Sequence, residues 1–378
     1  MLDGGHPGSR LRLFAAGLRV IDLSWFLPGP LASLLLADMG AEVWKVEPPA
    51  GDPMREVGPR DASGAPVFHA AVNAGKDVLR LDLKAPDGHA RFLDLVRRAD
   101  VLIEGFRPGV MARLGLDMPA LHAVNPGLIV CSLSGYGAAG PLAGAAGHDD
   151  NYLATAGVLH RNGEDRPTFL DPPVADGTGA LFAVVAILGA LRARDADGRG
   201  CHLDLALADV AMPLQLFQVA GYGATGEVPL PGATYLNGGA AYYRTYRCAD
   251  GGHVALGAIE PKFWRAFCLA AERPDLVGRQ DEPLPQRALI AEVADVVGRL
   301  TRDEAVARFG PADCCLSAVL DLGEAVESPH HRGRLLVRRG AGNALQTLFP
   351  AWVDGVPPAT RPAPREVGTE AAPSGVAD

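Results

Sequence analysis

Two hydrophobic periods alternate along the first half of the chain. Short apolar runs, typical of strands, are separated by longer runs whose apolar positions recur every three or four residues, as in helices. The sequence predicts strands over 17–24, 42–46, 100–105 and 127–133, and helices over 30–39, 89–98 and around 119–124. Strand, helix and strand in alternation favour a mostly parallel sheet with helices on both faces. The first lobe is therefore expected to be an α/β domain of the Rossmann-like type.

The pattern changes in the second half. An apolar helix is predicted over 177–194, residues 201–218 are expected to continue as buried structure, and the Gly- and Pro-rich stretch 221–239 is typical of a linker. Beyond it the sequence predicts short strands over 242–247 and 253–258 and helices over 261–271 and 287–300. This mixture indicates a smaller α+β domain.

The length of 378 residues fits two domains. We expect a large domain over 1–220, a linker over 221–241, a small domain over 242–325, and a C-terminal return to the large domain with a loose tail over 326–378.

Composition and charge exclude several classes of protein. The chain has 35 Lys and Arg against 44 Asp and Glu, a net charge of -9, which disfavours nucleic acid as a partner. The longest near-continuous apolar stretch, 180–191, is short of the ~20 residues that cross a bilayer, so no membrane span is expected. The first residues lack the features of a secretory signal, which predicts a cytoplasmic protein. The six cysteines form no CxxC pair, and we expect neither disulfides nor a metal site.

Nucleotide-binding fingerprints are absent after the first predicted strand. The sequence there is Phe26-Leu27-Pro28-Gly29-Pro30, not GxGxxG, and no GxxxxGK[ST] loop occurs in the chain. A dinucleotide or nucleoside triphosphate is therefore not indicated, and we expect no separate cofactor.

Three ionisable residues stand in settings that suit chemistry. His148 lies in a polar cluster after a Gly-rich stretch, which is typical of a functional loop and equally of a solvated surface loop. Asp176 precedes Gly-Thr-Gly and an apolar helix, so helix capping alone accounts for it, although the glycines leave room for a ligand. Glu260 precedes Pro261 and a predicted helix, where an acid is again a favourable cap. By themselves these residues indicate only a possible acid/base site.

Taken with these residues, several motifs make the chain similar to the class III CoA-transferase family, from residue 17 to about 337. Marks of the whole family are Leu-Ala-Asp-Met-Gly-Ala-Glu-Val within 35–43, Asp-Leu-Lys at 82–84, the stretch 100–110 with Glu-Gly-Phe-Arg-Pro-Gly, and Gly-Tyr-Gly at 135–137. Marks of its α-methylacyl-CoA racemase branch are Gly-His-Asp at 147–149 before Asn-Tyr, the tyrosines at 242, 243 and 246, and Gly-Ala-Ile-Glu-Pro at 257–261.

The resemblance implies roles for the ionisable residues. In the racemase branch His148 and Asp176 would flank the α-carbon of a 2-methylacyl-CoA thioester, and Glu260 would orient and charge His148, with Asp149 beside it. A hydrogen α to a thioester is a weak acid, so its removal needs a base and donors that stabilise the enolate oxygen. We expect these donors among the backbone amides of 176–179. The resemblance also implies an interlocked homodimer in which Glu260 can serve the partner's His148.

The resemblance further implies an acyl-CoA substrate, held by Arg107, Lys76, Tyr136 and Gly137. The chain departs from the branch at Pro48, where racemases commonly carry Arg. Two alternatives stay open: a class III CoA-transferase that uses Asp176 as a nucleophile and has no need of the His, or a repurposed family member with a non-CoA substrate. Neither a metal nor a redox cofactor enters any of these schemes.

Overall fold

The computed structural model describes residues 9–163 and 166–368, and the chain divides into two compact units. The large unit takes in residues up to Tyr152, Pro172–Leu214 and the chain from Ser328 on, and the small unit takes in Leu153–Asp171 and Gln215–Glu327. The chain therefore leaves the large unit twice, and the second return, at 328, lies close to the expected position of 326. The expected boundary at 220 lies six residues beyond the observed one at 214.

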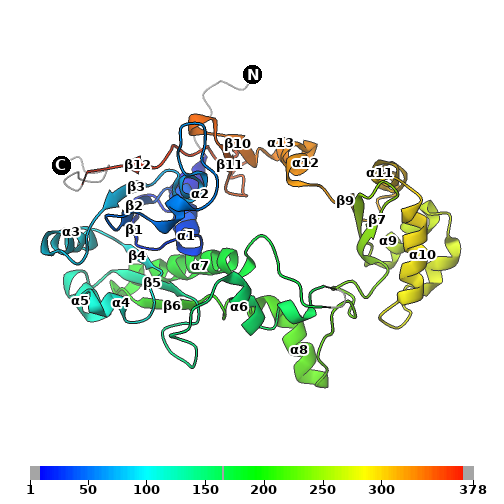
Figure 1. Ribbon diagram of the computed structural model, residues 1–378, viewed down its shortest axis with the longest axis horizontal. Helices are drawn as coiled ribbons and strands as arrows, with labels where there is room; N and C mark the ends of the chain where they lie inside the picture. Colours follow the sequence, from blue (N-terminus) through cyan, green and yellow to red (C-terminus); the bar gives the residue numbers. More distant parts are fainter. Residues whose placement is uncertain (1–8, 164–165, 369–378) are drawn as a thin grey trace. The chain divides into compact units, whose positions relative to one another are not determined.

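A seven-stranded parallel sheet forms the centre of the large unit (Figure 1). Its spatial order is β12 (Arg365–Glu366), β3 (Asp77–Arg80), β2 (Glu42–Glu47), β1 (Arg19–Asp22), β4 (Val101–Glu104), β5 (Ile129–Ser134) and β6 (His202–Ala206). All six strand pairs are parallel. The α/β class predicted from the alternating pattern is thus confirmed, with four of the seven strands predicted in place.

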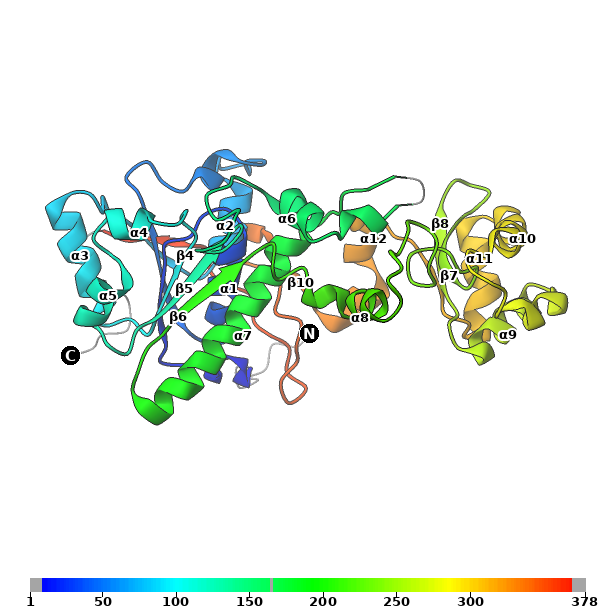
Figure 2. The ribbon, with the colours of Figure 1, turned by 90° about the horizontal axis from the view of Figure 1, so that it is seen from below.

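Helices cover both faces of this sheet (Figure 2). On one face lie α1 (Pro28–Asp38), α2 (Val67–Asn73) and α7 (Val174–Asp197), and on the other lie α3 (Pro86–Val96), α4 (Val110–Arg113) and α5 (Met118–Val124). α1 begins with Pro28 at its first position, where the missing N–H costs nothing. It ends before Gly40, which has φ +107° and no room for a Cβ, since that atom would lie 1.9 Å from the Arg12 carbonyl oxygen.

The apolar helix α7 is longer than the sequence pattern predicts. It packs against α1, β5 and β6, and its buried residues include Ala180, Val184 and Ile187. By length and composition it is the one helix in the described ranges that could cross a membrane, but a core helix passes the same test. Leu181 and Val185, one turn apart, remain 57% and 66% exposed, so an apolar strip of α7 faces away from the core.

The described end of the chain is firmly attached, and the prediction of a loose tail is wrong up to residue 368. Arg365 pairs with Asp77 through two hydrogen bonds of 2.7 and 2.6 Å and places β12 beside β3. Arg361 makes two 2.6 Å bonds to the buried Asp38 of α1. Residues 369–378 lie outside the described part. Long-range ion pairs, backbone pairing with β3 and the packing of Val367 on the core hold this Pro-rich segment, which is why its composition misleads.

Two local predictions hold only in part. Residues 201–218 are buried over 206–208, 210 and 211, but β6 is an edge strand whose side chains at His202 and Asp204 are exposed. The linker does not begin at 221, because α8 (Leu216–Thr225) runs through that position and ends at Gly226, which adopts the left-handed conformation at φ +72°. Both segments are rich in small and apolar residues. Such residues occur in buried and in exposed strands, and in helices as well as in linkers, so the composition does not distinguish these cases.

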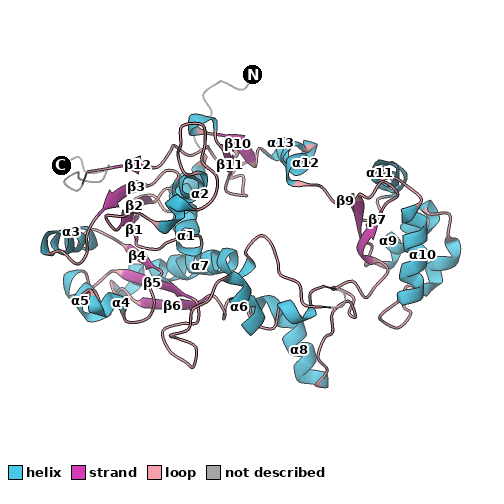
Figure 3. Cartoon of the chain, viewed as in Figure 1, coloured by secondary structure: helices cyan, strands magenta, loops and turns pink. Residues whose placement is uncertain are grey.

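The small unit contains a three-stranded antiparallel sheet and helices on one side of it (Figure 3). The strands are β7 (Tyr243–Arg247), β8 (His253–Gly257) and β9 (Leu316–Ala318), and the helices that pack with them are α9 (Pro261–Ala270), α10 (Arg287–Gly298) and α11 (Arg302–Phe309). Trp264, Phe267 and Phe309 form its aromatic core, with ring centroids 5.7 and 4.9 Å apart along the row. This arrangement confirms the predicted α+β character.

A buried charge network lies where β1 meets α1. Asp22 accepts hydrogen bonds from Ser24 and Ser33, and it forms ion pairs with Lys45 (3.9 Å) and Lys76 (3.1 Å). Burial acts to raise the pKa of Asp22, but the two ammonium groups and the hydroxyls outweigh it and hold that pKa well below its usual range. The network therefore fixes the turn after β1 with charges that water does not reach.

Replacing Lys76 by Met should destabilise the protein by about 3–5 kcal/mol, because Asp22 would keep its buried charge with half of its compensation removed. Urea unfolding followed by circular dichroism measures the change. Lys84→Met, at an exposed lysine, is the control and should shift the free energy of unfolding by less than about 0.5 kcal/mol. Equal stability of the two variants would show that the network is not what holds the turn.

Candidate active site

The strand order places a topological switch point between β1 and β4. From β1 the chain builds outward through β2 and β3, and then returns to add β4, β5 and β6 on the other side. Loops after β1 and β4 therefore diverge at the carboxyl edge of the sheet, which is where open α/β sheets bind ligands. Two cavities open at this edge, and they share a wall made of Trp25, Gly105, Phe106 and Arg107.

The first cavity, of about 420 Å³, contains the predicted catalytic pair. His148, Tyr152 and Asp176 all line it, together with residues that follow β1, β4 and β5. His148 is exposed and immediately precedes α6 (Asp149–Thr155), while Asp176 lies half-buried in the first turn of α7. Two segments 28 residues apart in sequence thus bring an imidazole and a carboxylate to one hollow.

One hydrogen bond joins these two segments. The Asp149 carboxylate accepts from the backbone N–H of Asp176 at 2.9 Å, so the first turn of α6 caps the first turn of α7. The residue before α7 is Pro173, whose side chain cannot accept a hydrogen bond, and Asp149 supplies the missing cap. Asn151 in turn accepts from the His148 N–H at 3.0 Å and fixes the start of α6.

The carboxyl group of Asp176 titrates near neutral pH. Burial raises its pKa to about 6, the negative charge of Asp149 adds to that effect, and His148 opposes it. The Asp149 carboxylate therefore has two effects on its neighbour: it holds the backbone of Asp176 and makes the side chain a stronger base. A carboxyl group with this pKa can both accept and release a proton at physiological pH.

Two expectations for Asp176 are corrected by this geometry. Asp176 is the third residue of α7 and not its cap, because the helix begins at Val174. The amides of 176–179 are also not free oxyanion donors, since Asp176 N–H donates to Asp149 and Gly177 N–H donates to the Pro173 carbonyl at 3.2 Å. The sequence places the helix start three residues late because Val174 and Ala175 do not distinguish a helix from a loop.

Tyrosine rings and glycines shape the cavity wall. Tyr152 donates to the Gly147 carbonyl at 2.5 Å and meets Tyr136 edge to face at 5.2 Å between ring centroids. A Cβ on Gly135 or Gly147 would come within 2.7 or 2.8 Å of the Tyr152 ring. The Gly-rich stretch before His148 therefore allows close packing on this ring, which holds the His148 loop against the core.

The second cavity, of about 590 Å³, is largely apolar and carries three cationic side chains. Arg107 follows β4, Arg113 lies in α4, and Lys84 follows β3. Arg113 was not among the candidates from the sequence, and neither was Lys84 as a ligand residue. The family mark at 82–84 contains Lys84, and Arg113 lies three residues after the mark at 100–110. Because β3 is only four residues long and was not predicted, this edge of the sheet could not be placed from the sequence.

Two of the four residues expected to bind CoA, Lys76 and Gly137, line neither of these two cavities. Lys76 cannot bind a phosphate, because its ammonium is fully buried and its three donors bond Asp22 (3.1 Å), the Pro30 carbonyl (2.8 Å) and Asn73 (3.0 Å). Gly137 lines neither cavity. It makes a turn with φ +81°, and its N–H donates to the Ser134 hydroxyl at 3.0 Å.

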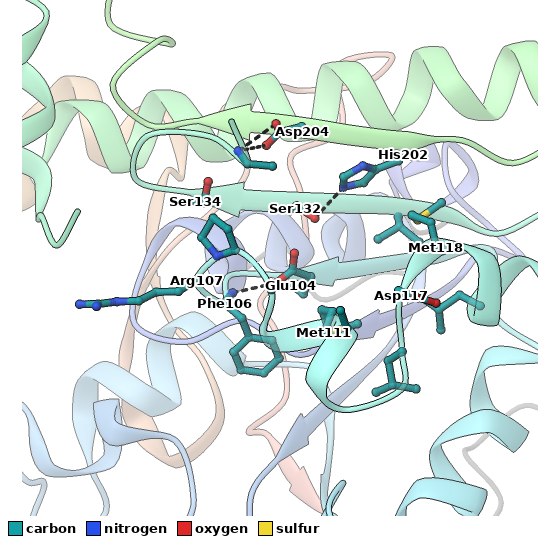
Figure 4. A pocket seen from close by; sticks show the side chains of 17 residues that line it. Glu104, Phe106, Arg107, Met111, Asp117, Met118, Ser132, Ser134, His202 and Asp204 are labelled. Atoms are coloured by element: carbon teal, nitrogen blue, oxygen red, sulfur yellow. Dashed lines mark hydrogen bonds between the residues drawn. The ribbon is translucent and has the colours of Figure 1, made fainter. Parts of the chain in front are cut away.

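The other two expected residues lie at the cavities. Tyr136 lines the first, and Arg107 lines both. Glu104 holds the loop that carries Arg107 by accepting from the Phe106 N–H at 2.7 Å, and the Arg107 side chain extends away from this carboxylate (Figure 4). Its guanidinium makes no hydrogen bond or ion pair with any residue of the described ranges, so it is available to an anionic ligand.

Glu260 belongs to the small unit. It directly precedes Pro261 at the start of α9, and its side chain is exposed and makes no capping hydrogen bond. Capping, the simpler explanation of this acid, is therefore not what its side chain does.

The fold and its cavities define an α/β protein with an imidazole, a carboxylate and a free guanidinium at a topological switch point. Comparison with known proteins agrees with this class. The model of CoA-transferase family III matches residues 15–375, and the chain belongs to that family.

Its relatives include two kinds of enzyme. The human alpha-methylacyl-CoA racemase is 34% identical over 326 residues, which is 84% of this chain and 81% of the relative. The alpha subunit of the succinyl-CoA–L-malate CoA-transferase of Chloroflexus aurantiacus is 35% identical over 315 residues, 80% of this chain and 73% of the relative. The crystal structure of a CAIB/BAIF family protein from Brucella suis superposes with a TM-score of 0.82 at 28% identity, covering 93% of this chain and 96% of that one.

Asp176→Asn should make the protein more stable at pH 8, by about 1–3 kcal/mol. A carboxyl pKa of about 6 in the folded state lies above the ordinary value of 3.8, so ionising Asp176 above pH 6 opposes folding, and the amide removes that cost. The advantage should shrink as the pH falls from 6 to 4, where the wild-type carboxyl takes up a proton.

Urea unfolding of both proteins at pH 8 and pH 5 measures this difference. Asp150→Asn, at an exposed neighbour, is the control and should change stability by less than about 0.5 kcal/mol at either pH. A loss of stability in Asp176→Asn at pH 8 would contradict the raised pKa.

Proposed function

We propose that the protein is a racemase or epimerase that inverts the α-carbon of 2-methylacyl-CoA thioesters. The observation that carries the proposal is that His148 and Asp176 line one cavity from separate segments. A transferase mechanism needs a single nucleophilic carboxylate, whereas inversion of a carbon needs a second acid/base group on the opposite face.

The proposed reaction consists of two proton transfers through an enolate. One of the two groups removes the α-hydrogen as a proton, and the electron pair of the C–H bond moves onto the thioester oxygen. The other group, protonated at the start, then delivers its proton to the opposite face as the enolate returns its electrons. For the other enantiomer His148 and Asp176 exchange roles. Both proton transfers use side chains of the protein, and we propose no cofactor beyond the CoA of the substrate.

Enolate stabilisation is assigned to the start of α6. The first-turn amides of a helix have no carbonyl partner within it, and those of Asp149 and Asp150 open α6 directly beside His148. We propose these amides as the oxyanion donors in place of the amides of α7, which already donate hydrogen bonds within the protein. A thioester oxygen at this position would lie next to the imidazole and near the positive end of a helix.

The nucleotide of CoA is assigned to the second cavity. Its apolar walls suit an adenine ring and its three cationic groups suit phosphates, with Arg107 on the wall shared with the acid/base cavity. In this proposal the three cationic groups bind the phosphates in place of Lys76. They also supply the positive charge that is missing at Pro48, where racemases commonly carry Arg. Glu260 is proposed to orient the partner's His148 in the homodimer that the resemblance implies.

The transferase alternative has one observation in its favour. CoA-transferases are among the relatives at similar identity, and an Asp176 that is mostly ionised at pH 7 is a competent nucleophile. In that case the carboxylate would attack the thioester carbonyl, form a mixed anhydride and release CoA as the thiolate. An acceptor acid would then be essential.

Incubation of a 2-methylacyl-CoA in D2O should replace the α-hydrogen by deuterium without any acceptor acid, as followed by proton NMR. His148→Ala should slow this exchange by about 10²–10⁴-fold for the enantiomer whose α-hydrogen His148 removes, because the base on that face has been removed. His253→Ala, at an exposed histidine of β8, should exchange like the wild type. Absence of label, with CoA transferred to an added acceptor acid and Asp176 trapped by hydroxylamine, would establish the transferase instead.

We also propose that the protein is a homodimer, as the resemblance implies. The exposed apolar strip of α7 supports this, because Leu181 and Val185 would otherwise stay in contact with water. A second copy of the chain would bury this strip.

Val185→Lys should weaken the dimer, because a charge would enter its apolar contact. Light scattering after size exclusion should give twice the chain mass for the wild type and a shift toward the monomer for the variant. Asp195→Lys, an exposed change on another side of the same helix, should remain dimeric. A wild-type monomer over the micromolar range would refute the proposal.

A further inference from the structure

A basic segment follows the second return of the chain to the large unit. Residues 330–339 read His-His-Arg-Gly-Arg-Leu-Leu-Val-Arg-Arg, which is six basic residues in ten with no acid, in a chain of net charge -9. The segment comprises the end of α13 (Pro329–Arg334) and β10 (Val337–Arg339), which pairs with β11 (Leu345–Thr347). None of these residues takes part in the proposed reaction.

Most of the arginines in this segment have structural partners. Arg338 donates to the Pro358 carbonyl at 3.4 Å, and Arg339 donates to the Asn343 carbonyl at 3.0 Å. Arg334 differs: its guanidinium makes no hydrogen bond or ion pair with any residue in the described ranges. It is held instead over the Trp352 ring, 4.7 Å from the ring centroid.

A small cavity of about 210 Å³ lies at this point, and its lining has one guanidinium and two imidazoles but no carboxylate. His330, His331 and Arg334 line it from α13, and Phe349 and Trp352 line it from the segment after β11. The two imidazoles meet edge to face at 5.2 Å between ring centroids. Three nitrogen-bearing groups therefore surround one hollow whose remaining walls are apolar.

The structure holds these groups in place before any ligand binds. The Trp352 indole N–H donates to the Arg334 carbonyl at 2.9 Å, so the ring that supports the guanidinium is itself tied to the same residue. His331 is fixed through its Nδ1, which lies 3.0 Å from the Ser328 hydroxyl. A guanidinium stacked on an aromatic ring loses little rotamer entropy when it binds an anion, and its planar fork fits two oxygens.

We propose that this cavity is a binding site for a phosphate monoester group, separate from the acid/base cavity, with which it shares no lining residue. Arg334 would bind two phosphate oxygens and the His330 imidazole a third. Phosphate is favoured over carboxylate because these two side chains can reach three terminal oxygens, whereas a carboxylate has two. The small volume and apolar walls favour one such group over an extended polyanion.

Trp352 provides the test, because its ring is part of the cavity. Methyl phosphate titrated into the intact protein at constant ionic strength should change the tryptophan fluorescence in a saturable way. Trp352→Phe should abolish this change although three other tryptophans remain. Acetate should bind more weakly than methyl phosphate.

Arg334→Gln should weaken methyl phosphate binding about tenfold or more, because a charge-assisted pair of hydrogen bonds is lost. Arg332→Gln is the matched control: it makes the same change on the same helix at a residue outside the cavity lining, and it should bind like the wild type. Should Arg334→Gln fail to fold by circular dichroism, His330→Asn tests the same cavity and should also weaken binding.

Three results would overturn the proposal. Equal weakening by Arg332→Gln and Arg334→Gln would show diffuse attraction to the basic segment instead of a site. Tighter binding of acetate would show that the ligand class is wrong. A fluorescence change that survives in Trp352→Phe would place the bound phosphate elsewhere in the protein.

Discussion

The candidate site depends on one hydrogen bond, from the backbone of Asp176 to the carboxylate of Asp149. This contact joins the first turns of α6 and α7, so the position of His148, one residue before Asp149, is fixed relative to the Asp176 side chain. The same carboxylate raises the pKa of Asp176 through its charge. Asp149 thus contributes to both the position and the basicity of Asp176, although burial is the larger cause of the raised pKa.

The surrounding fold makes this arrangement possible at a cost in stability. A raised carboxyl pKa means that the ionised form of Asp176 is disfavoured in the folded protein. The buried ion pairs of Asp22 with Lys45 and Lys76 lie at the end of β1, behind the turn that lines the cavity, and keep that edge of the sheet rigid. A local loss of folding stability of this kind is common at functional sites. The same carboxylate suits a racemase and a transferase, which explains why relatives of both kinds occur in one family.

Local patterns in the sequence were sufficient for much of the fold. The strands at 42–47 and 101–104 are bounded by turns and have strong periodicity, and the motif before His148 correctly marked a loop at the cavity. Contacts distant in sequence were not predictable in this way. β12 joins the sheet through β3, almost 300 residues earlier, and β3 is too short to show a period. Lys76 was misjudged because a lysine is rarely fully buried, and only the fold shows the carboxylate that accepts its charge.

The proposed mechanism requires that His148 and Asp176 act from opposite faces of one carbon. Each of them removes the α-hydrogen of one enantiomer, so exchange with that enantiomer measures that group. The initial rate at which deuterium enters the α-carbon should therefore be measured for the R and the S substrate separately. Both variants, His148→Ala and Asp176→Asn, are tested with each enantiomer. The account predicts that neither variant inverts the carbon, and that each retains exchange with only one enantiomer, the opposite one in the two variants. If both variants lose exchange with the same enantiomer, or either still inverts the carbon at the wild-type rate, the two groups do not flank it.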